Sequence, residues 1–550
     1  MAGDAVLAGD ATNPATPNLS ATSAARLGGR AIALAGLVVV AGVMLSRVLG
    51  WLRFAVFAAR YGTGPDLSAF IVAFRIPDTL FQLVAAGAVG SALVPVASAL
   101  LANGEERRAR RLVATIANLM VLGLIPLAAA VWVAAPMLVP IVGPSSDPSQ
   151  VALEVELTRW MLISPIFLAM AAAFTAGLNA AGIFGAPALA PNIYNLAIIG
   201  AAVLLTPFMG IYGLAAGVVL GAVGHMGIQA YAVREQGLYG LVIDLRDPAV
   251  KETLLLMAPR ALGLGVTQIV FLVNTFFAVQ AHLGAQGQVA GLDIYTYAFT
   301  ALQIPVGLIG VPLGIVLLPP LSRAIAGGDK ERFGRLVDQA LRLTLYVVIP
   351  LTGLMLVLAT PTLGLLFQHG NFTPEATSLA APVYVVFLLG LVAHVLISLL
   401  APIFYAGKDT RTPVTAALVA VAVDVAAAGL LFPLFGLVGL ALAIGLGAWA
   451  EVSMLLYLMR HRIGFELEPL GRTVAFAIPG AALAAAATLG SFRFLDSQAG
   501  GSMAFPVVVV EVGLAGLVGV AVYMAWSRSV RRPEFTEVLH IVRTVLGRAG

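Results

Sequence analysis

The sequence contains no cysteine and few charged residues. Because none of its 550 residues is cysteine, a disulfide framework, thiolate chemistry and a cysteine-ligated metal site are excluded. Only 11% of the residues are charged, against about 25% in an ordinary soluble domain, and 60% are hydrophobic. So few charges cannot cover the surface of a soluble chain of this length. The composition excludes a soluble enzyme, a disordered protein and a fibrous protein, and it predicts an all-α polytopic membrane protein.

The sequence also lacks the short motifs of nucleotide and cofactor chemistry. It has no Walker loop, no GxSxG, no dinucleotide fingerprint and no spacing of metal ligands. We therefore expect no enzymatic activity, no cofactor and no metal site, and transport energy from an ion gradient, the membrane potential or the substrate gradient. A net charge of +4 gives no indication of a nucleic-acid partner. Residues 1–30 are polar and small and predict a disordered tail without a cleavable signal peptide.

Apolar stretches long enough to cross a bilayer, which takes about 20 residues, recur along the whole chain. They predict about fourteen transmembrane helices, at residues 31–57, 66–100, 112–141, 153–181, 187–207, 211–232, 253–283, 294–324, 338–367, 378–405, 413–433, 436–459, 471–491 and 504–527. With the N-terminus in the cytoplasm, 23 of the 31 basic residues fall on the cytoplasmic side and two on the opposite side. This asymmetry predicts cytoplasmic N- and C-termini. Residues 528–550 predict an amphipathic cytoplasmic tail.

An internal repeat relates the two halves of the chain. Residues 103–113 (NGEERRARRLV) match residues 327–337 (GGDKERFGRLV) at a constant offset of 224, and the same offset pairs Pro95 with Pro319 and Pro126 with Pro350. The repeat predicts two parallel six-helix lobes at residues 31–235 and 250–462, followed by two extra helices at 470–527. Parallel repeats of this kind are typical of transporters that move two lobes around a central cavity.

Several ionisable residues lie inside the predicted spans, where charge is costly and indicates function. Arg47 and Arg53 lie in the first span, and Arg260 lies near the start of the seventh. If the repeat holds, Arg47 and Arg260 face one another across the cavity, and a cationic cavity implies an anionic substrate such as a phosphate. The alternative for each arginine is to reach the membrane surface or to pair with a carbonyl group. For Arg75 we expect the membrane surface.

Asp424 is the acidic residue that lies deepest in a predicted span. A lone buried carboxylate must be neutral, paired or bound to a cation. We therefore consider a structural, protonated Asp424 and, alternatively, a cation site to which Asn274 and Thr275 contribute neutral oxygens. The candidate ions are Na⁺ and H⁺.

At this point the chain resembles a known family, the MurJ (MviN) lipid II flippases of the multidrug/oligosaccharidyl-lipid/polysaccharide exporter superfamily. The resemblance covers about residues 30–530. It is carried by Ser46-Arg47-Val48-Leu49-Gly50 with Arg53, Ala69-Phe70 through Ile76-Pro77, Gly177-Leu178-Asn179, Pro191 with Asn195, Asn274-Thr275, Pro305-x-Gly307-x-x-Gly310, residues 366–373 (LFQHGNFT), and residues 400–405 (LAPIFY) with Asp409 and Thr412-Pro413-Val414.

The resemblance implies a transporter of the bacterial inner membrane. It would flip undecaprenyl-diphosphate-linked disaccharide-pentapeptide outward for peptidoglycan synthesis by alternating access. Ser46, Arg47 and Arg53 match the family's first-span motif, whose arginines would bind the diphosphate, and Arg260 would add a second-lobe cation. The last two spans would form a groove for the lipid tail. We expect membrane lipids as neighbours and a monomer.

The chain departs from the family at four positions. Ser68 and Ala86 stand where the family has acids, and Phe81 and Thr300 stand where it has arginines. These changes leave open a flippase for another polyprenyl-diphosphate glycan, such as an O-antigen or exopolysaccharide unit. A cation-coupled drug exporter fits less well, because it predicts an acid-lined cavity, and a membrane scaffold does not explain the intramembrane arginines.

Overall fold

The protein is described by a computed structural model that covers residues 29–84, 88–284, 289–407, 409, 411–463, 465–500 and 504–538. Within these residues the chain is helical apart from its connections and one short antiparallel pair of strands, β1 (His282–Leu283) and β2 (Val289–Ala290). The predicted all-α class is confirmed. The predicted tail at 1–30 lies almost wholly outside the described residues.

The structure describes nine helices in the first half of the chain. They are α2 (Gly29–Tyr61), α3 (Pro65–Val84), α4 (Ala88–Ala102), α5 (Glu106–Val142), α6 (Pro148–Met161), α7 (Ser164–Ala180), α8 (Gly185–Leu204), α9 (Thr206–Met209) and α10 (Tyr212–Glu235). Several helices begin at a capping residue followed by proline, such as Asp147-Pro148 and Asp247-Pro248. The capping carboxylate accepts a backbone N–H that the helix leaves unbonded, and proline at the first position needs no acceptor.

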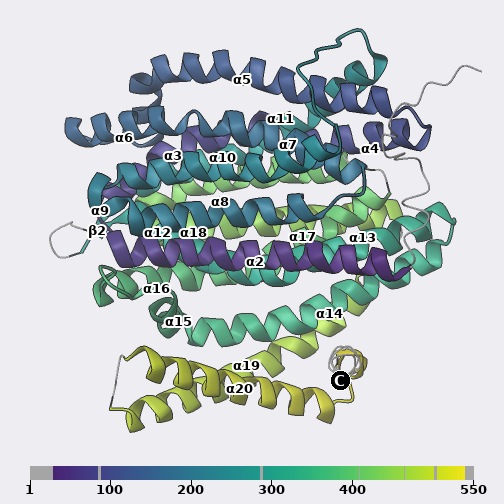
Figure 1. Cartoon of the computed structure of the whole chain (residues 1–550). Coiled ribbons are helices and arrows are strands. Elements are labelled where there is room, and N and C mark those ends of the chain that lie inside the picture. Colours follow the sequence, from purple (N-terminus) through teal and green to yellow (C-terminus); the bar gives the residue numbers. More distant parts are fainter. Residues whose placement is uncertain are drawn as a thin grey trace, which may run out of the picture.

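The second half follows the same plan and adds a helical pair. Its helices are α11 (Pro248–Val279), α12 (Gly291–Pro305), the π-helix η1 (Val306–Gly310), α13 (Val311–Ala326), α14 (Lys330–Val357), α15 (Ala359–Phe367), α16 (Pro374–Leu389), α17 (Leu391–Ala406), α18 (Arg411–Ile463), α19 (Glu468–Gln498) and α20 (Phe505–Ser529). In Figure 1 the helices run side by side, with α5 at one edge of the bundle and α19–α20 at the other.

Ten of the described helical segments are long and apolar enough to cross a membrane, and eleven if the bent pair α16–α17 counts as one span. The chain is therefore a multi-pass membrane protein, while the number fourteen stays a prediction. The difference has identifiable sources. The second predicted span falls on α3 and α4, between which residues 85–87 are not described, and α18 counts once although its backbone breaks at Gly436.

The structure repeats its turns between the two halves. Gly104 and Gly328, 224 residues apart, both have positive φ (77° and 71°), and each precedes the start of a helix, α5 and α14. Gly210 and Gly436, at the slightly larger offset of 226, form a second pair, with φ of 57° and 56°. A backbone with positive φ favours glycine, which has no Cβ. The second pair explains the break in α18, because it corresponds to the turn between α9 and α10.

The end of the described chain folds back onto the bundle. Residues 533–538 are helical. Phe535 and Val538 pack against a cluster on α14, α19 and α20 that includes Tyr346, Phe476 and Tyr523. This part of the predicted amphipathic tail therefore contacts protein, and the remainder, from residue 539 on, lies outside the described residues.

Candidate functional site

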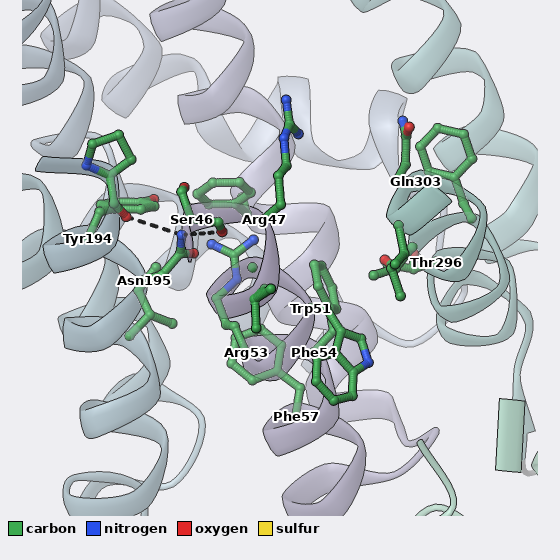
Figure 2. A pocket seen from close by; sticks show the side chains of 18 of the residues that line it. Ser46, Arg47, Trp51, Arg53, Phe54, Phe57, Tyr194, Asn195, Thr296 and Gln303 are labelled. Atoms are coloured by element: carbon green, nitrogen blue, oxygen red, sulfur yellow. Dashed lines mark hydrogen bonds between the residues drawn. The ribbon is translucent and has the colours of Figure 1, made fainter. Parts of the chain in front are cut away.

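A cavity of about 1040 Å³ lies between the two halves of the chain. The first half supplies its wall from α2, α3, α8 and α10, and the second half supplies α11, α12, η1 and α15. Figure 2 shows α2 with Arg47 and Arg53, flanked by Tyr194 and Asn195 and, on the other side, by Thr296 and Gln303. The cavity is thus built where the repeat places the two halves against each other.

The predicted residues of the first span meet in this cavity. Ser46, Arg47 and Arg53 all line it. The carbonyl oxygen of Ser46 accepts a hydrogen bond of 3.4 Å from Nδ2 of Asn195, which joins α2 to α8 (Figure 2). Arg47 and Arg53 therefore share one cavity, while their role in binding a substrate stays a prediction.

Arg53 lies in a largely apolar part of the cavity. Its Nε is buried without a hydrogen-bond partner in the described part of the chain, and its guanidinium lies 5.2 Å from the centre of the Phe54 ring. A cation held against an aromatic ring keeps some stabilisation, but an unpaired buried charge is costly. The site is therefore suited to receive an anion.

Arg47 passes close to the second half of the chain. A Cβ atom on Gly307 of η1 would lie 3.1 Å from Cδ of Arg47, so a larger residue there would push the arginine stem aside. Arg47 makes no hydrogen bond or ion pair of its own with another described residue. The glycine of the Pro305-x-Gly307 motif thus helps to position the cavity arginine, a role that the sequence did not indicate.

The prediction that Arg75 reaches the membrane surface is wrong. Arg75 lines the cavity, its Nε donates a hydrogen bond of 2.9 Å to Oγ1 of Thr275, and its guanidinium lies 5.5 Å from the centre of the Phe271 ring. Both partners belong to α11 in the other half of the chain. A contact across 200 residues has no local signal in the sequence, which is why Arg75 was missed.

The second half contributes neutral side chains to the described wall. Thr296, Phe299, Thr300 and Gln303 of α12 line the cavity, and none of the described lining residues of this half is charged. Arg260 belongs to α11, but its side chain lies outside the described residues, so its predicted position opposite Arg47 stays a prediction.

The four departures from the family pattern have different surroundings. Phe81 and Thr300 both line the cavity, so the missing arginines would have pointed into it. Ser68 donates a hydrogen bond of 2.9 Å to Oδ1 of Asp293, a buried acid on α12 that the sequence analysis did not single out. Ala86 lies outside the described residues.

Asp424 and Asn274 lie together, as one of the two alternatives requires. Nδ2 of Asn274 donates a hydrogen bond of 3.1 Å to Oδ2 of Asp424, and both residues are buried. Oδ1 of Asp424 and Oδ1 of Asn274 have no hydrogen-bond partner among the described residues. Two unsatisfied acceptors side by side are an arrangement that a small cation or a proton would complete. Thr275, the next residue, turns toward Arg75 instead.

One end of the cavity is closed by contacts between the halves. Asn371, in the connection between α15 and α16, bonds the end of α2 twice: its N–H donates to the carbonyl of Ala59 at 2.9 Å, and its Nδ2 donates to the carbonyl of Arg60 at 2.7 Å. The hydroxyl of Tyr297 donates to the carbonyl of Gly62 at 3.0 Å. Under the predicted topology this is the end away from the cytoplasm.

Together these observations define a class: a multi-pass helical protein whose two halves, in contact at one end, enclose a cavity with arginines that form no ion pair with a described residue. That is the architecture of a transporter for an anionic substrate. The family model described as "Lipid II flippase MurJ" matches residues 57–510, and the chain belongs to that family.

Similar proteins agree with this assignment. A lipid II flippase MurJ of Burkholderia cenocepacia is 33% identical over 453 residues, which cover 80% of this chain and 86% of that protein. A probable lipid II flippase MurJ of Rhizobium meliloti is also 33% identical and covers 80% and 83%. A solved structure of lipid II flippase MurJ in an inward closed conformation has a TM-score of 0.73 at 21% identity and covers 90% and 100%. An inward-facing multidrug transporter of the MATE family shares the fold at a TM-score of 0.62 and 16% identity, covering 78% and 98%.

Proposed function

We propose that this protein flips lipid II, an undecaprenyl-diphosphate-linked peptidoglycan precursor, across the bacterial cytoplasmic membrane. The observation that carries the proposal is the pair Arg47 and Arg53, which line the cavity between the halves without an ion-pair partner in the described part of the chain. A diphosphate presents several oxygens at once, and guanidinium groups bind such oxygens in pairs. The protein acts as a transporter that moves its lipid without changing covalent bonds.

The proposed binding mode divides the substrate between two places. The diphosphate would meet Arg47 and Arg53, with Asn195 beside them joining α8 to α2 through its bond to the carbonyl of Ser46. The lipid tail would use the α19–α20 pair, where a groove of about 660 Å³ is lined by apolar residues such as Phe494, Leu495 and Leu517. A charged head against the cavity arginines and an apolar tail against the bilayer is the division that an amphiphilic substrate needs.

Alternating access would require the closed end to open. The contacts of Asn371 and Tyr297 with the end of α2 would have to break, and equivalent contacts would have to form at the cytoplasmic end. In this scheme both termini lie in the cytoplasm, and the cavity takes its substrate from the cytoplasmic side.

We propose further that a monovalent cation, Na⁺ or H⁺, couples to transport at Asp424 and Asn274, with the membrane potential adding to the driving force. Neighbouring residues of α11 support this assignment: Asn274 bonds Asp424 of α18, while Thr275 bonds Arg75 of α3. A cation at Asp424 would act on α11 and, through Thr275, on an arginine of the cavity wall. Thr275 would thus link the cation site to the substrate cavity.

A second candidate function is a flippase for another polyprenyl-diphosphate glycan. The specific observation in its favour is that Phe81 and Thr300 line the cavity at positions where the family has arginines. Both candidates need the same diphosphate contacts, and they differ in the sugar and peptide that the remaining wall accepts. A drug exporter is disfavoured because the described lining contains arginines and no acidic residue.

Complementation tests the proposal. We expect the wild-type chain to rescue a bacterial strain depleted of its own lipid II flippase, and Arg47→Ala to fail at an equal membrane level. A wild type that inserts well but does not rescue would argue against lipid II as the substrate. Rescue of a strain that lacks an O-antigen flippase instead would favour the second candidate.

The coupling proposal has its own test. We expect accumulation of flipped lipid in proteoliposomes to depend on a Na⁺ or H⁺ gradient, and Asp424→Asn to remove that dependence while diphosphate binding persists. If Asp424→Asn responds to both gradients like the wild type, the cation does not act at Asp424, and the substrate assignment is unaffected.

A further inference from the structure

The segment between α10 and α11, residues 236–247, joins the two halves and is clamped onto α5. The clamp is Asn118, a buried residue of α5. Its Nδ2 donates hydrogen bonds of 3.0 Å to the carbonyl oxygens of both Gly240 and Val242, and its Oδ1 accepts one of 2.9 Å from the hydroxyl of Tyr239. The three hydrogen bonds of this buried side chain therefore hold the connection in place.

Further contacts hold the rest of the segment. Oγ1 of Thr115, also on α5, accepts a hydrogen bond of 3.1 Å from the backbone N–H of Asp244. Asp247 accepts two hydrogen bonds of 2.8 Å from Arg108 at the start of α5. The connection is thus not a free tether between the halves, because it is fixed along the first turns of α5.

The outward side of the same segment is apolar. Leu241 is 92% exposed, Leu245 63% and Ile243 46%. These residues alternate with Gly240, Val242 and Asp244, whose backbone groups bond to α5, as side chains alternate in an extended chain. An ordered loop in water rarely presents a row of large aliphatic side chains. The carbonyl groups of Gly240 and Val242 and the N–H of Asp244 thus face α5, while apolar side chains face outward, as they do at the boundary between headgroups and acyl chains.

The position along α5 points to the same environment. Asn118 lies seven residues after Arg111, the last of four arginines at the start of the helix, which corresponds to roughly 10 Å along the axis. Farther along the same face of α5, Leu122 and Ile125 are exposed. The apolar row of the segment therefore continues the exposed apolar stripe of α5, while the arginines lie at the level of lipid headgroups.

We propose that residues 241–245 insert into the acyl-chain boundary of the cytoplasmic leaflet and anchor the connection between the halves to lipid. The occupant of this surface is lipid acyl chain, because the row continues a helix face that meets the bilayer, and Asn118 and Thr115 of α5 hold the segment against that face. The inference takes the leaflet from the proposed topology but does not depend on the transported substrate. The first half would carry the anchored connection with it when the halves move.

The absence of cysteine makes the test direct, since a single introduced cysteine has no background. Leu241→Cys and Leu245→Cys, each carrying a nitroxide spin label, are reconstituted in vesicles of phosphatidylcholine and phosphatidylglycerol. Accessibility to oxygen, which concentrates in lipid, is compared with accessibility to a water-soluble nickel complex. Leu122→Cys serves as the lipid-facing reference, and Arg246→Cys, on the same connection, as the water-facing control.

We expect the labels at 241 and 245 to resemble the label at 122, with oxygen dominant, and the label at 246 to favour nickel. Asn118→Ala should release the clamp and raise label mobility at 241 without changing it at 122. Nickel accessibility at 241 and 245 equal to that at 246 would overturn the proposal, because the segment would lie in water. Protection from both reagents would also overturn it, because another protein chain would then cover the surface.

Discussion

The arginines of the cytoplasmic rim and those of the cavity differ in their partners. On the rim, Arg108 pairs with Glu105 and Asp247, and Arg342 pairs with Asp338 and Glu534. In the cavity, Arg47, Arg53 and Arg75 have no carboxylate within ion-pair distance among the described residues. Asp78 lies within electrostatic range of Arg53 and Arg75, but the described contacts include no ion pair with either.

The difference separates two uses of the same side chain. A rim arginine lies next to water and pairs with a carboxylate, so its charge is already compensated and binds a further anion only weakly. A cavity arginine in low-dielectric surroundings is costly until an anion arrives, so its charge is available to a substrate. Substitutions of cavity arginines should therefore lower transport with little loss of stability. Substitutions in the rim pairs should lower stability with little effect on transport.

The largest expected effect is the loss of transport in Arg53→Ala. Removing charge-assisted hydrogen bonds to a diphosphate should lower affinity at least about tenfold. Because Arg53 has no ion pair to lose, the free energy of unfolding should not fall. Rescue of a flippase-depleted strain, together with thermal unfolding of the purified protein, measures both properties. Arg159→Ala, on the outer face of α6 where Arg159 stacks on Trp132, is the matched control and should rescue normally.

The next effect concerns the rim and should appear in stability alone. Oε1 of the buried Glu534 accepts hydrogen bonds of 3.2 Å from both Arg342 and Thr473, so Glu534→Ala removes two bonds, one of them an ion pair, while Arg342 keeps its pair with Asp338. We expect a loss of about 1–3 kcal/mol in the free energy of unfolding, with rescue retained. The control Glu331→Ala breaks an exposed pair with Arg335 and should cost less than about 0.5 kcal/mol. Equal losses in both variants would show that burial does not distinguish the two rim pairs.

Thr275→Val should have an intermediate effect on the cavity. The change removes the hydroxyl oxygen that accepts the hydrogen bond from Arg75, with little change in side-chain volume. The guanidinium of Arg75 is then free to move in the cavity, so the affinity for diphosphate should change by roughly 2–10-fold. If Thr275 links the two sites, the effect of Na⁺ or pH on diphosphate affinity should also shrink. A linkage that survives in Thr275→Val but disappears in Asp424→Asn would reject the link and keep the cation site.

The smallest effect is the pH dependence of one rim pair. Hydrogen bonds from Arg108, and from the N–H of Ala249, lower the pKa of Asp247. A lowered pKa means that the stabilisation is complete above the ordinary aspartate value of about 3.9 and is lost as the pH falls through the lowered value. The difference in unfolding temperature between wild type and Asp247→Asn should therefore be constant near neutral pH and shrink in acid. A difference that grows in acid would contradict this assignment.

Features that depend on composition and on local pattern were predictable from the sequence. The helical class follows from scarce charge, and the repeat follows from residues at a fixed offset. Ser46, Arg47 and Arg53 lie within two turns of one helix, and all three line the cavity. The break of α18 at Gly436 was predicted as well, because the predicted spans 413–433 and 436–459 separate at this point.

Features that depend on contacts between distant segments were not predictable. Arg75 was expected at the membrane surface, because its partner Thr275 lies in the other half of the chain. The hydrogen bond between Ser68 and Asp293 also joins segments that are far apart in the sequence. It places the carboxylate of Asp293 next to Ser68, which is the position where the family has an acid. The approach of Gly307 to Arg47 required the π-helical turn η1, which leaves no periodic trace in the sequence.

The most direct test of the account is equilibrium binding of purified lipid II to the purified protein, with inorganic pyrophosphate as competitor. The account predicts that pyrophosphate displaces lipid II from the wild type, and that Arg53→Ala weakens both ligands at least about tenfold. It also predicts that the rim variant Arg335→Ala binds both ligands as the wild type does. Unchanged binding in Arg53→Ala, or equal losses in the cavity and rim variants, would contradict the claim that the cavity arginines hold the diphosphate.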